Sequence, residues 1–125
     1  MSGNRYLLDT NAIVALLQGN KRIIQLLLNA NWIGISIISQ IEFLVFSELT
    51  ESDRQLFQQF LKRVEVLGLT IGDAALIDQI IEVRQQYRLK LPDAIIASMT
   101  TQNSASLVTA DQAFARINNL RVIHW

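Results

Sequence analysis

The chain has 125 residues, half of them hydrophobic, and its 11 acidic residues balance its 11 basic ones, so the formal net charge is zero. Domains most often have about 100–150 residues, which predicts a single domain over residues 1–125, and the apolar content excludes an intrinsically disordered chain. The neutral charge excludes a general basic surface for nucleic acid, so a phosphate-bearing ligand would need local basic patches or a metal ion.

Several other classes are excluded by what the sequence lacks. It has no cysteine, and therefore no disulfide, thiolate metal site or cysteine nucleophile, which fits a cytoplasmic protein. No uninterrupted apolar run reaches the roughly 18 residues that predict a membrane span, and Asp9 interrupts the N-terminal apolar stretch too early for a signal peptide. Neither a P-loop nor a GxGxxG motif is present, so no nucleotide cofactor is expected.

The first half of the chain predicts two strands, each followed by helices. Residues 5–8 are a short apolar run and residues 32–37 alternate β-branched with small residues, both typical of strands. Helices are predicted over residues 10–18 (ended by Gly19), 21–30, 38–49 and 52–64.

The second half continues the alternation. A strand is expected over residues 64–69, and Gly72-Asp73 then opens a helix, with Asp73 as its N-cap. This helix should bury one apolar face, consisting of Leu76, Ile77, Ile80, Ile81, Val83 and Tyr87. The remaining predicted elements are a helix from Pro92 to residue 102, a strand over 106–110, a short helix over 111–117 and a strand over 120–125. Strands alternating with helices predict an α/β three-layer sandwich, with a central parallel sheet of about four to five strands flanked by helices.

Four of the 11 acids lie in apolar segments: Asp9, Glu42, Asp93 and Asp111. None has a lysine or arginine within two residues, so a local ion pair is not available to them. Acids among apolar residues are rarely buried unless they are paired or bound to a metal ion.

Three of these acids also have an ordinary structural explanation. Asp9 and Asp111 each stand between a strand and a helix, where either could serve only as an N-cap. Asp93 directly follows Pro92 and could simply favour the positive end of its helix. Glu42 lies mid-helix with apolar neighbours, so capping does not explain it, and its alternatives are solvent or a distant arginine.

The predicted topology brings the four acids to one place. In a parallel α/β sheet the ends of strands and the starts of helices meet at the carboxyl edge, where ligands bind. Carboxylates that converge there repel one another, and a divalent cation removes this cost. Oxygen ligands select Mg²⁺ or Mn²⁺ over Zn²⁺, and such an ion activates a water for phosphodiester hydrolysis.

Four segments of the chain resemble the PIN-domain nucleases, and most closely their VapC-type toxins. These segments are Leu7-Leu8-Asp9-Thr10-Asn11, Ser39-Gln40-Ile41-Glu42, Leu91-Pro92-Asp93-Ala94, and Val108-Thr109-Ala110-Asp111 with Phe114. The resemblance covers nearly the whole chain, in the family's order and spacing. One departure is Gln112, where a basic residue is common in the family.

The resemblance implies a metal-dependent endoribonuclease with Asp9, Glu42, Asp93 and Asp111 as catalytic residues and metal ligands. It implies supporting hydrogen bonds from Thr10 or Asn11 and from Thr109. Family members are commonly homodimers and are held inactive by an antitoxin, so the expected partners are RNA, a cognate antitoxin and a second copy of the chain.

Other assignments stay open at this point. Arg84, Arg88 and Lys90 either approach RNA phosphates or form a solvated helix end, and His124 is expected to be a structural or surface residue rather than a general base. The apolar surplus in Phe43, Val45, Phe46 and Leu26–Leu28 indicates either a dimer or antitoxin surface or ordinary core packing.

Three other classes compete with the nuclease. A haloacid-dehalogenase-like phosphatase would need a second acid at the position of Asn11, and a receiver domain would need an early acidic pair. A catalytically degenerate PIN domain that binds RNA or protein is the non-enzyme alternative.

Overall fold

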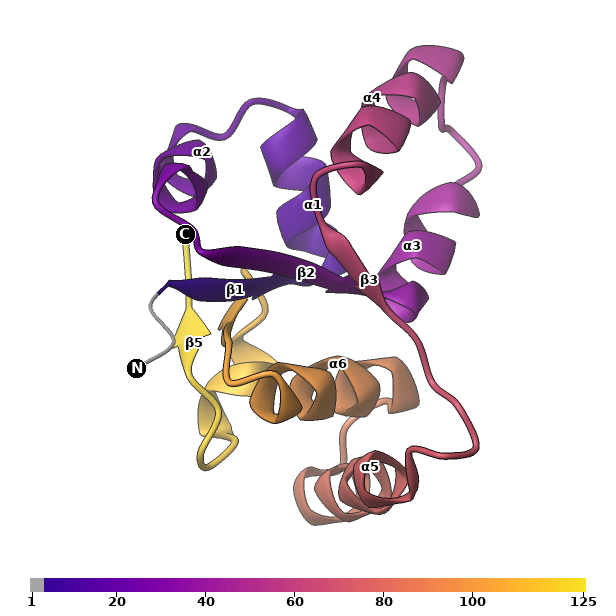
Figure 1. Ribbon diagram of the computed structural model, residues 1–125, viewed down its shortest axis with the longest axis vertical. Coiled ribbons are helices and arrows are strands. Elements are labelled where there is room, and N and C mark those ends of the chain that lie inside the picture. The colour runs from indigo at the N-terminus through magenta and orange to yellow at the C-terminus, as the bar shows by residue number, and fades with distance from the viewer. Residues whose placement is uncertain (1–3) are drawn as a thin grey trace.

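A five-stranded parallel sheet forms the centre of the protein, as seen in a computed structural model that describes residues 4–125 (Figure 1). The strands are β1 (Arg5–Leu8), β2 (Trp32–Ser36), β3 (Glu65–Leu67), β4 (Ser106–Val108) and β5 (Val122–Ile123). Their order is β3-β2-β1-β4-β5, and every neighbouring pair is parallel.

Helices cover both faces of the sheet, which makes three layers (Figure 1). One face carries α1 (Thr10–Leu17), α2 (Lys21–Leu28), α3 (Ile37–Leu44) and α4 (Glu51–Leu61). The other carries α5 (Ala74–Tyr87), α6 (Leu91–Gln102) and the 3-10 helix η1 (Gln112–Arg116). The predicted three-layer α/β architecture is confirmed. None of the described helices has the length and apolarity needed to cross a membrane.

The apolar core is divided between the two sides of the sheet. Leu7 of β1 packs with the residues of α5 and α6, whereas Tyr6 and Leu8 pack with those of α1, α3 and α4. Successive side chains of a strand point to opposite faces, and a strand covered on both faces is therefore apolar throughout. This explains why β1 reads as a continuous apolar run.

The strand order places a topological switch point between β1 and β4. From β1 the chain builds β2 and β3 on one side, and it then crosses to build β4 and β5 on the other. Helices leave the two central strands in opposite directions at such a point, which opens a crevice at their carboxyl ends. Asp9 directly follows β1, and its backbone N–H donates to the carbonyl of Val108 at the end of β4 (3.3 Å).

The structure differs from the predicted helices and strands mainly in where they end. The helix expected over 38–49 ends at Leu44 instead, and α4 starts at Glu51 behind a Thr50–Asp53 capping box. Val45 and Phe46 are 72% and 57% exposed, so no apolar contact supports a longer helix there. The strands expected over 64–69, 106–110 and 120–125 are each shorter, with the bounds given above.

Helix α5 also buries less than its pattern predicts. Leu76 and Ile80 are 3% and 5% exposed, but Ile77 and Ile81, predicted to face inward, are 38% and 48% exposed. The helix packs chiefly against α6, so it buries only a narrow stripe. Asp73 is the N-cap residue of α5 as predicted, but its side chain does not cap the helix and instead accepts from the backbone N–H (3.0 Å) and hydroxyl (3.2 Å) of Thr70.

Candidate active site

A polar pocket of about 220 Å³ lies at the carboxyl edge of the sheet, beside the switch point. Its lining residues are Asp9, Thr10, Asn11, Glu42, Asp93, Ile96 and Asp111. The structure therefore brings the four acids singled out in the sequence to one place, although they come from four different segments of the chain. Thr109, the remaining residue named from the sequence, is fully buried and contacts two of these acids.

Asp9 is the most deeply placed acid of the four, with 5% of its surface exposed. Its Oδ1 accepts from the backbone N–H of Ala12 (2.9 Å), which caps α1, and its Oδ2 accepts from the hydroxyl of Thr109. Burial raises the pKa of Asp9 above its ordinary value, and the nearby Asp111 and Asp93 raise it further, while the two hydrogen bonds act in the opposite direction. Asp9 is thus both a helix cap and a member of the acidic pocket.

Asp111 plays a similar double role at the end of β4. Its Oδ1 accepts from the backbone N–H of Ala113 (2.9 Å) and caps η1. Its own backbone N–H donates to the hydroxyl oxygen of Thr109 (3.0 Å). Because Thr109 Oγ1 accepts this bond, its single proton is directed to Asp9, and one hydroxyl joins the two acids.

Asp93 lies in the first turn of α6, directly after Pro92, and is half-buried. Burial raises the pKa of Asp93, Asp111 and then Glu42 raise it further, and Lys90 lowers it. Two neighbouring carboxylates acting on Asp93 indicate that negative charge is concentrated in this pocket.

Glu42 is in the pocket for a different reason from the one its sequence context suggested. It is exposed, and so are its neighbours Ile41 and Val45, at 52% and 72%. Its apolar sequence context therefore does not make Glu42 a buried residue, and the expected alternative of solvent exposure holds for part of its surface. What fixes Glu42 is the hydroxyl of Thr10, which donates to its Oε1 at 2.6 Å and links α1 to α3.

A family model for the PIN domain matches residues 6–120. The chain belongs to the PIN-domain family. The match includes β2, β3, β4 and all of β1 except Arg5, and it includes every residue of the acidic pocket. No curated protein matches the sequence of this PIN domain.

Solved structures share the fold of this PIN domain over nearly its full length. One is a VapBC2 complex from Rickettsia felis bound to a DNA fragment from the promoter; it is 26% identical, with a TM-score of 0.80 and coverage of 97% of this chain and 98% of that one. Another is a toxin–antitoxin complex from Klebsiella pneumoniae, 27% identical with a TM-score of 0.77 and coverage of 94% and 95%. A DNA-bound VapBC from Salmonella typhimurium, 23% identical with a TM-score of 0.77 and coverage of 98% of both chains, shares the fold. These matches confirm the resemblance found in the sequence.

The donor set of the pocket fits a divalent cation of the Mg²⁺ type. All four ionisable groups are carboxylates, which are hard oxygen ligands, and burial together with their mutual repulsion raises the pKa of Asp9 and Asp93. Within residues 4–125, no three acidic, histidine or cysteine side chains are already arranged so that they could hold a metal ion together. The pocket thus supplies the chemistry of a metal site, and its side chains would have to adjust to an ion.

Ile96 lines the acidic pocket, whereas His124 lies outside it. Ile96 forms its apolar wall and was missed in the sequence, although its place three residues after Asp93 puts it on the same face of α6. His124 does not line the pocket; it lies beside the last strand, where its Nε2 is buried without a hydrogen-bond partner.

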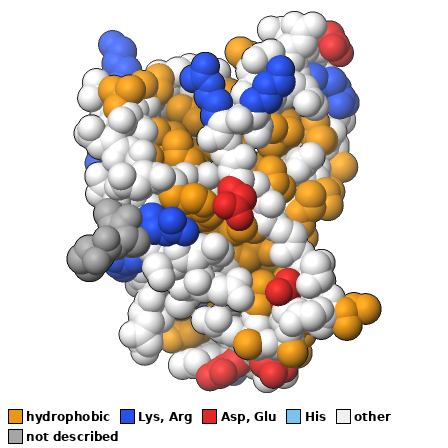
Figure 2. All heavy atoms as spheres, in the orientation of Figure 1, with side chains coloured by type: hydrophobic (Ala, Val, Ile, Leu, Met, Phe, Trp, Pro, Cys, Tyr) orange, Lys and Arg blue, Asp and Glu red, His pale blue; other side chains and the backbone are white. Residues whose placement is uncertain are grey.

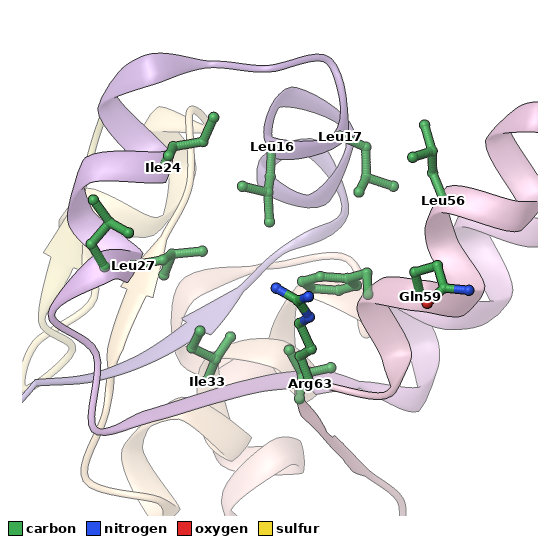
Figure 3. A pocket seen from close by; sticks show the side chains of 11 residues that line it. Leu16, Leu17, Ile24, Leu27, Ile33, Leu56, Gln59 and Arg63 are labelled. Atoms are coloured by element: carbon green, nitrogen blue, oxygen red, sulfur yellow. The ribbon is translucent and has the colours of Figure 1, made fainter.

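An apolar groove of about 450 Å³ lies elsewhere on the surface, between α1, α2 and α4 (Figure 3). Leu16 and Leu17 come from α1, Ile24 and Leu27 from α2, and Leu56 from α4. Arg63, just after α4, is the one cationic side chain in its lining, and its guanidinium lies among the apolar side chains (Figure 3). The groove leaves large apolar side chains in contact with solvent.

Proposed function

We propose that this PIN domain is a Mg²⁺- or Mn²⁺-dependent endoribonuclease and the toxin of a VapBC-type toxin–antitoxin pair. The observation that carries the proposal is the convergence of Asp9, Glu42, Asp93 and Asp111 on one pocket at the topological switch point. Membership of the PIN-domain family and the likeness to toxin–antitoxin complexes from two bacteria support it.

In this proposal the four carboxylates hold the cation, and the surrounding residues hold the carboxylates. When bound, a divalent ion supplies positive charge for the phosphate oxygens and lowers the pKa of a water. Thr109 keeps one oxygen of Asp9 in place through its hydroxyl, and Thr10 does the same for Glu42. Asn11 lines the same pocket with an amide that can donate to a phosphate oxygen.

The apolar groove is the proposed docking site for the antitoxin. Leu28, Leu56 and Ile24 in its lining are 70%, 47% and 38% exposed, which suits the apolar face of an amphipathic helix. Lysine and arginine side chains gather at the end of the molecule where α2 and α4 lie, and acidic ones gather around α5 (Figure 2). The helix that fills the groove should therefore carry acidic residues along its flanks.

The proposed toxin is a homodimer that works in the cytoplasm. Val45 and Phe46 at the end of α3 and Ile71 after β3 are exposed apolar side chains outside the groove, and a second copy of the chain would cover them in a homodimer. A ribonuclease restrained by an antitoxin works in the cytoplasm, where its RNA and its partner are made.

Cleavage of a mixed panel of RNAs, followed by mapping of the RNA ends, tests the nuclease. We expect cuts with Mn²⁺ or Mg²⁺, none in EDTA, and none with Asp9→Asn. If the wild type leaves every RNA intact with either ion, and Asp9→Asn binds Mn²⁺ as the wild type does, the protein is a degenerate PIN domain that acts as a binding module.

If a short reading frame lies next to the gene, co-expression with its product tests the antitoxin site. Leu28→Lys, in the groove, should weaken the complex at least tenfold, because it places a charge where an apolar side chain would be buried. Ile81→Lys changes an apolar residue of α5 that is 48% exposed and lies outside both the groove and the proposed dimer surface, and it should leave the affinity unchanged. Equal affinities of the two variants would exclude the groove.

A further inference from the structure

A second polar pocket, of about 300 Å³, lies between α5, α6 and residues 117–119, and we call it the α5–α6 pocket. Its rim consists of Gln79, Glu82, Gln86, Thr101, Asn118 and Asn119. Its volume is at the lower end of the range of about 300–1,000 Å³ that is typical of small-molecule sites. None of the rim residues belongs to the acidic pocket.

The polar residues from α5 form one stripe of the helix. Gln79, Glu82 and Gln86 are spaced by three and four residues, so they lie on the same side of α5. The floor beneath them is apolar, since it contains Ala97 and Ile117, which are 2% and 7% exposed. A pocket with an apolar floor and a polar rim suits a flat ring that carries hydrogen-bonding groups on its edge.

One wall of the α5–α6 pocket is fixed by hydrogen bonds between segments far apart in the sequence. The hydroxyl oxygen of Tyr87 accepts from the backbone N–H of Asn118 (3.0 Å), and the backbone carbonyl of Tyr87 accepts from the guanidinium of Arg116 (2.7 Å). Tyr87, at the end of α5, is therefore tied to η1 and to the segment after it. An aromatic ring held in this way can contact a nucleobase without first being ordered.

The charge of the α5–α6 pocket decides which part of a nucleotide it can take. No lysine or arginine is among its lining residues, and Glu82 contributes a carboxylate, so a phosphate would be repelled. Glutamine and asparagine amides pair with base edges, and a carboxylate accepts from an exocyclic amino group. The ligand that fits best is a base with an exocyclic amino group, because uracil offers the carboxylate only its N3–H, which lies between two carbonyl oxygens that a carboxylate repels.

Helix α6 connects the α5–α6 pocket with the acidic pocket. Asp93 and Ile96 line the acidic pocket, and Ala97 and Thr101 line the other. At a rise of 1.5 Å per residue, Ala97 and Thr101 lie about 6 and 12 Å from Asp93 along the helix axis. Along the helix axis this separation is short enough for one RNA strand to extend from the acidic pocket to the α5–α6 pocket.

We propose that the α5–α6 pocket binds a nucleobase of the RNA substrate close to the cleaved bond, and that it selects adenine, guanine or cytosine over uracil. This inference rests on the proposed ribonuclease function and specifies its substrate. It gives the nuclease a base preference that the acidic pocket alone cannot supply, because a metal ion recognises phosphate oxygens rather than bases.

The test compares Gln86→Met with Gln85→Met. Both residues are exposed glutamines of α5, but only Gln86 lines the α5–α6 pocket, so the second variant controls for the loss of an amide from the helix. Mapping of RNA ends should show a base preference at one position near the cut in the wild type and in Gln85→Met. In Gln86→Met the preference should fall roughly tenfold, as expected for the loss of a paired base contact. An unchanged preference in Gln86→Met would overturn the proposal.

A second measurement is independent of cleavage. Titration of the ¹⁵N-labelled wild type with AMP, GMP, CMP and UMP in EDTA should shift the amide signals around Gln86 and Asn118 with the first three nucleotides and much less with UMP. If the wild type cleaves no RNA, the proposed function fails, but this titration still tests whether the α5–α6 pocket binds a base. Shifts with free nucleotides combined with an unchanged cleavage preference would mean a nucleotide site unconnected with RNA, and would overturn the proposal.

Discussion

The hydroxyl of Thr109 donates to Asp9 Oδ2 across 100 positions of sequence, while its oxygen accepts from the backbone N–H of Asp111. All three residues lie at the carboxyl ends of the neighbouring strands β1 and β4. One buried side chain therefore sets the position of one acid and of the segment that carries another.

Replacing Thr109 by valine removes both hydrogen bonds while keeping the shape of the side chain. A buried carboxylate oxygen and a backbone N–H are then left unpaired, which should lower the free energy of unfolding by about 1–3 kcal/mol. Affinity for Mn²⁺ should fall by about 10–100-fold, the usual loss when a partner of a metal ligand is removed.

Urea denaturation and Mn²⁺ titration measure the two effects of the Thr109 substitution. Thr109→Ser retains the hydroxyl and should restore most of the Mn²⁺ affinity. If the Thr109→Val and Thr109→Ser variants bind Mn²⁺ equally well, the hydroxyl does not position Asp9.

Asp93→Asn should stabilise the metal-free protein at pH 7. The pKa of Asp93 is raised above 3.8 by burial and by Asp111 and Glu42, so the folded state disfavours the ionised form relative to the unfolded state. Stability of the wild type therefore falls as the pH rises from about 3.8 through the raised pKa, and the cost is fully present above it. Asparagine does not titrate and avoids this cost.

The pH dependence and the effect of a cation check the prediction for Asp93. The difference in urea midpoint between Asp93→Asn and the wild type should disappear below pH 3.8, where the carboxyl is protonated in both states. At a Mn²⁺ concentration 100 times the dissociation constant the wild type should gain about 2.7 kcal/mol, and the variant much less. A variant that is less stable than the wild type in EDTA at pH 7 would contradict this account.

Phe57 of α4 is fully buried, and its ring stacks on that of Phe43 in α3 at a centroid distance of 4.2 Å. Phe57→Ala should lower the free energy of unfolding by about 3–5 kcal/mol, because it removes the contact between the two helices and leaves a cavity. Phe57→Leu fills most of the space and should cost clearly less. Urea denaturation of the two variants measures the difference, and equal losses would show that the site collapses around alanine.

Gly34 of β2 leaves room for the Trp32 ring, since a Cβ at position 34 would lie 2.1 Å from the nearest ring atom. Gly34→Ala should therefore displace the ring from the Arg5 guanidinium above it, 4.5 Å from the ring centroid, and from Glu65, to which its Nε1 donates at 3.1 Å. The loss of these contacts should cost about 1–2 kcal/mol.

In a Trp125→Phe background, which leaves Trp32 as the single tryptophan, fluorescence reports the movement expected in Gly34→Ala as a red shift of the emission. In the background of Trp32→Leu the smaller side chain leaves space, and the alanine should cost little. An unshifted spectrum with unchanged stability would mean that the ring finds an equally good position.

How much the sequence could predict is clearest at Asp9 and Glu42. Asp9 follows an apolar run and precedes a helix, so its place at the carboxyl edge followed from pattern alone, and its burial agrees. Glu42 was expected at the same edge and lines the pocket, but its apolar neighbours Ile41 and Val45 are exposed, because an apolar neighbour in sequence is not always a buried neighbour in space. The end of α3 at Leu44 was missed for the same reason.

The four acids at the carboxyl edge therefore rest on two kinds of information. The alternation of strands and helices, which is local, determined a parallel sheet with functional groups at one edge, because side-chain periodicity follows directly from backbone geometry. Only the tertiary structure decided that Thr109 joins Asp9 to Asp111, that Thr10 holds Glu42, and that α6 borders two pockets. These contacts depend on strand order and helix packing between distant segments, and no local pattern specifies them.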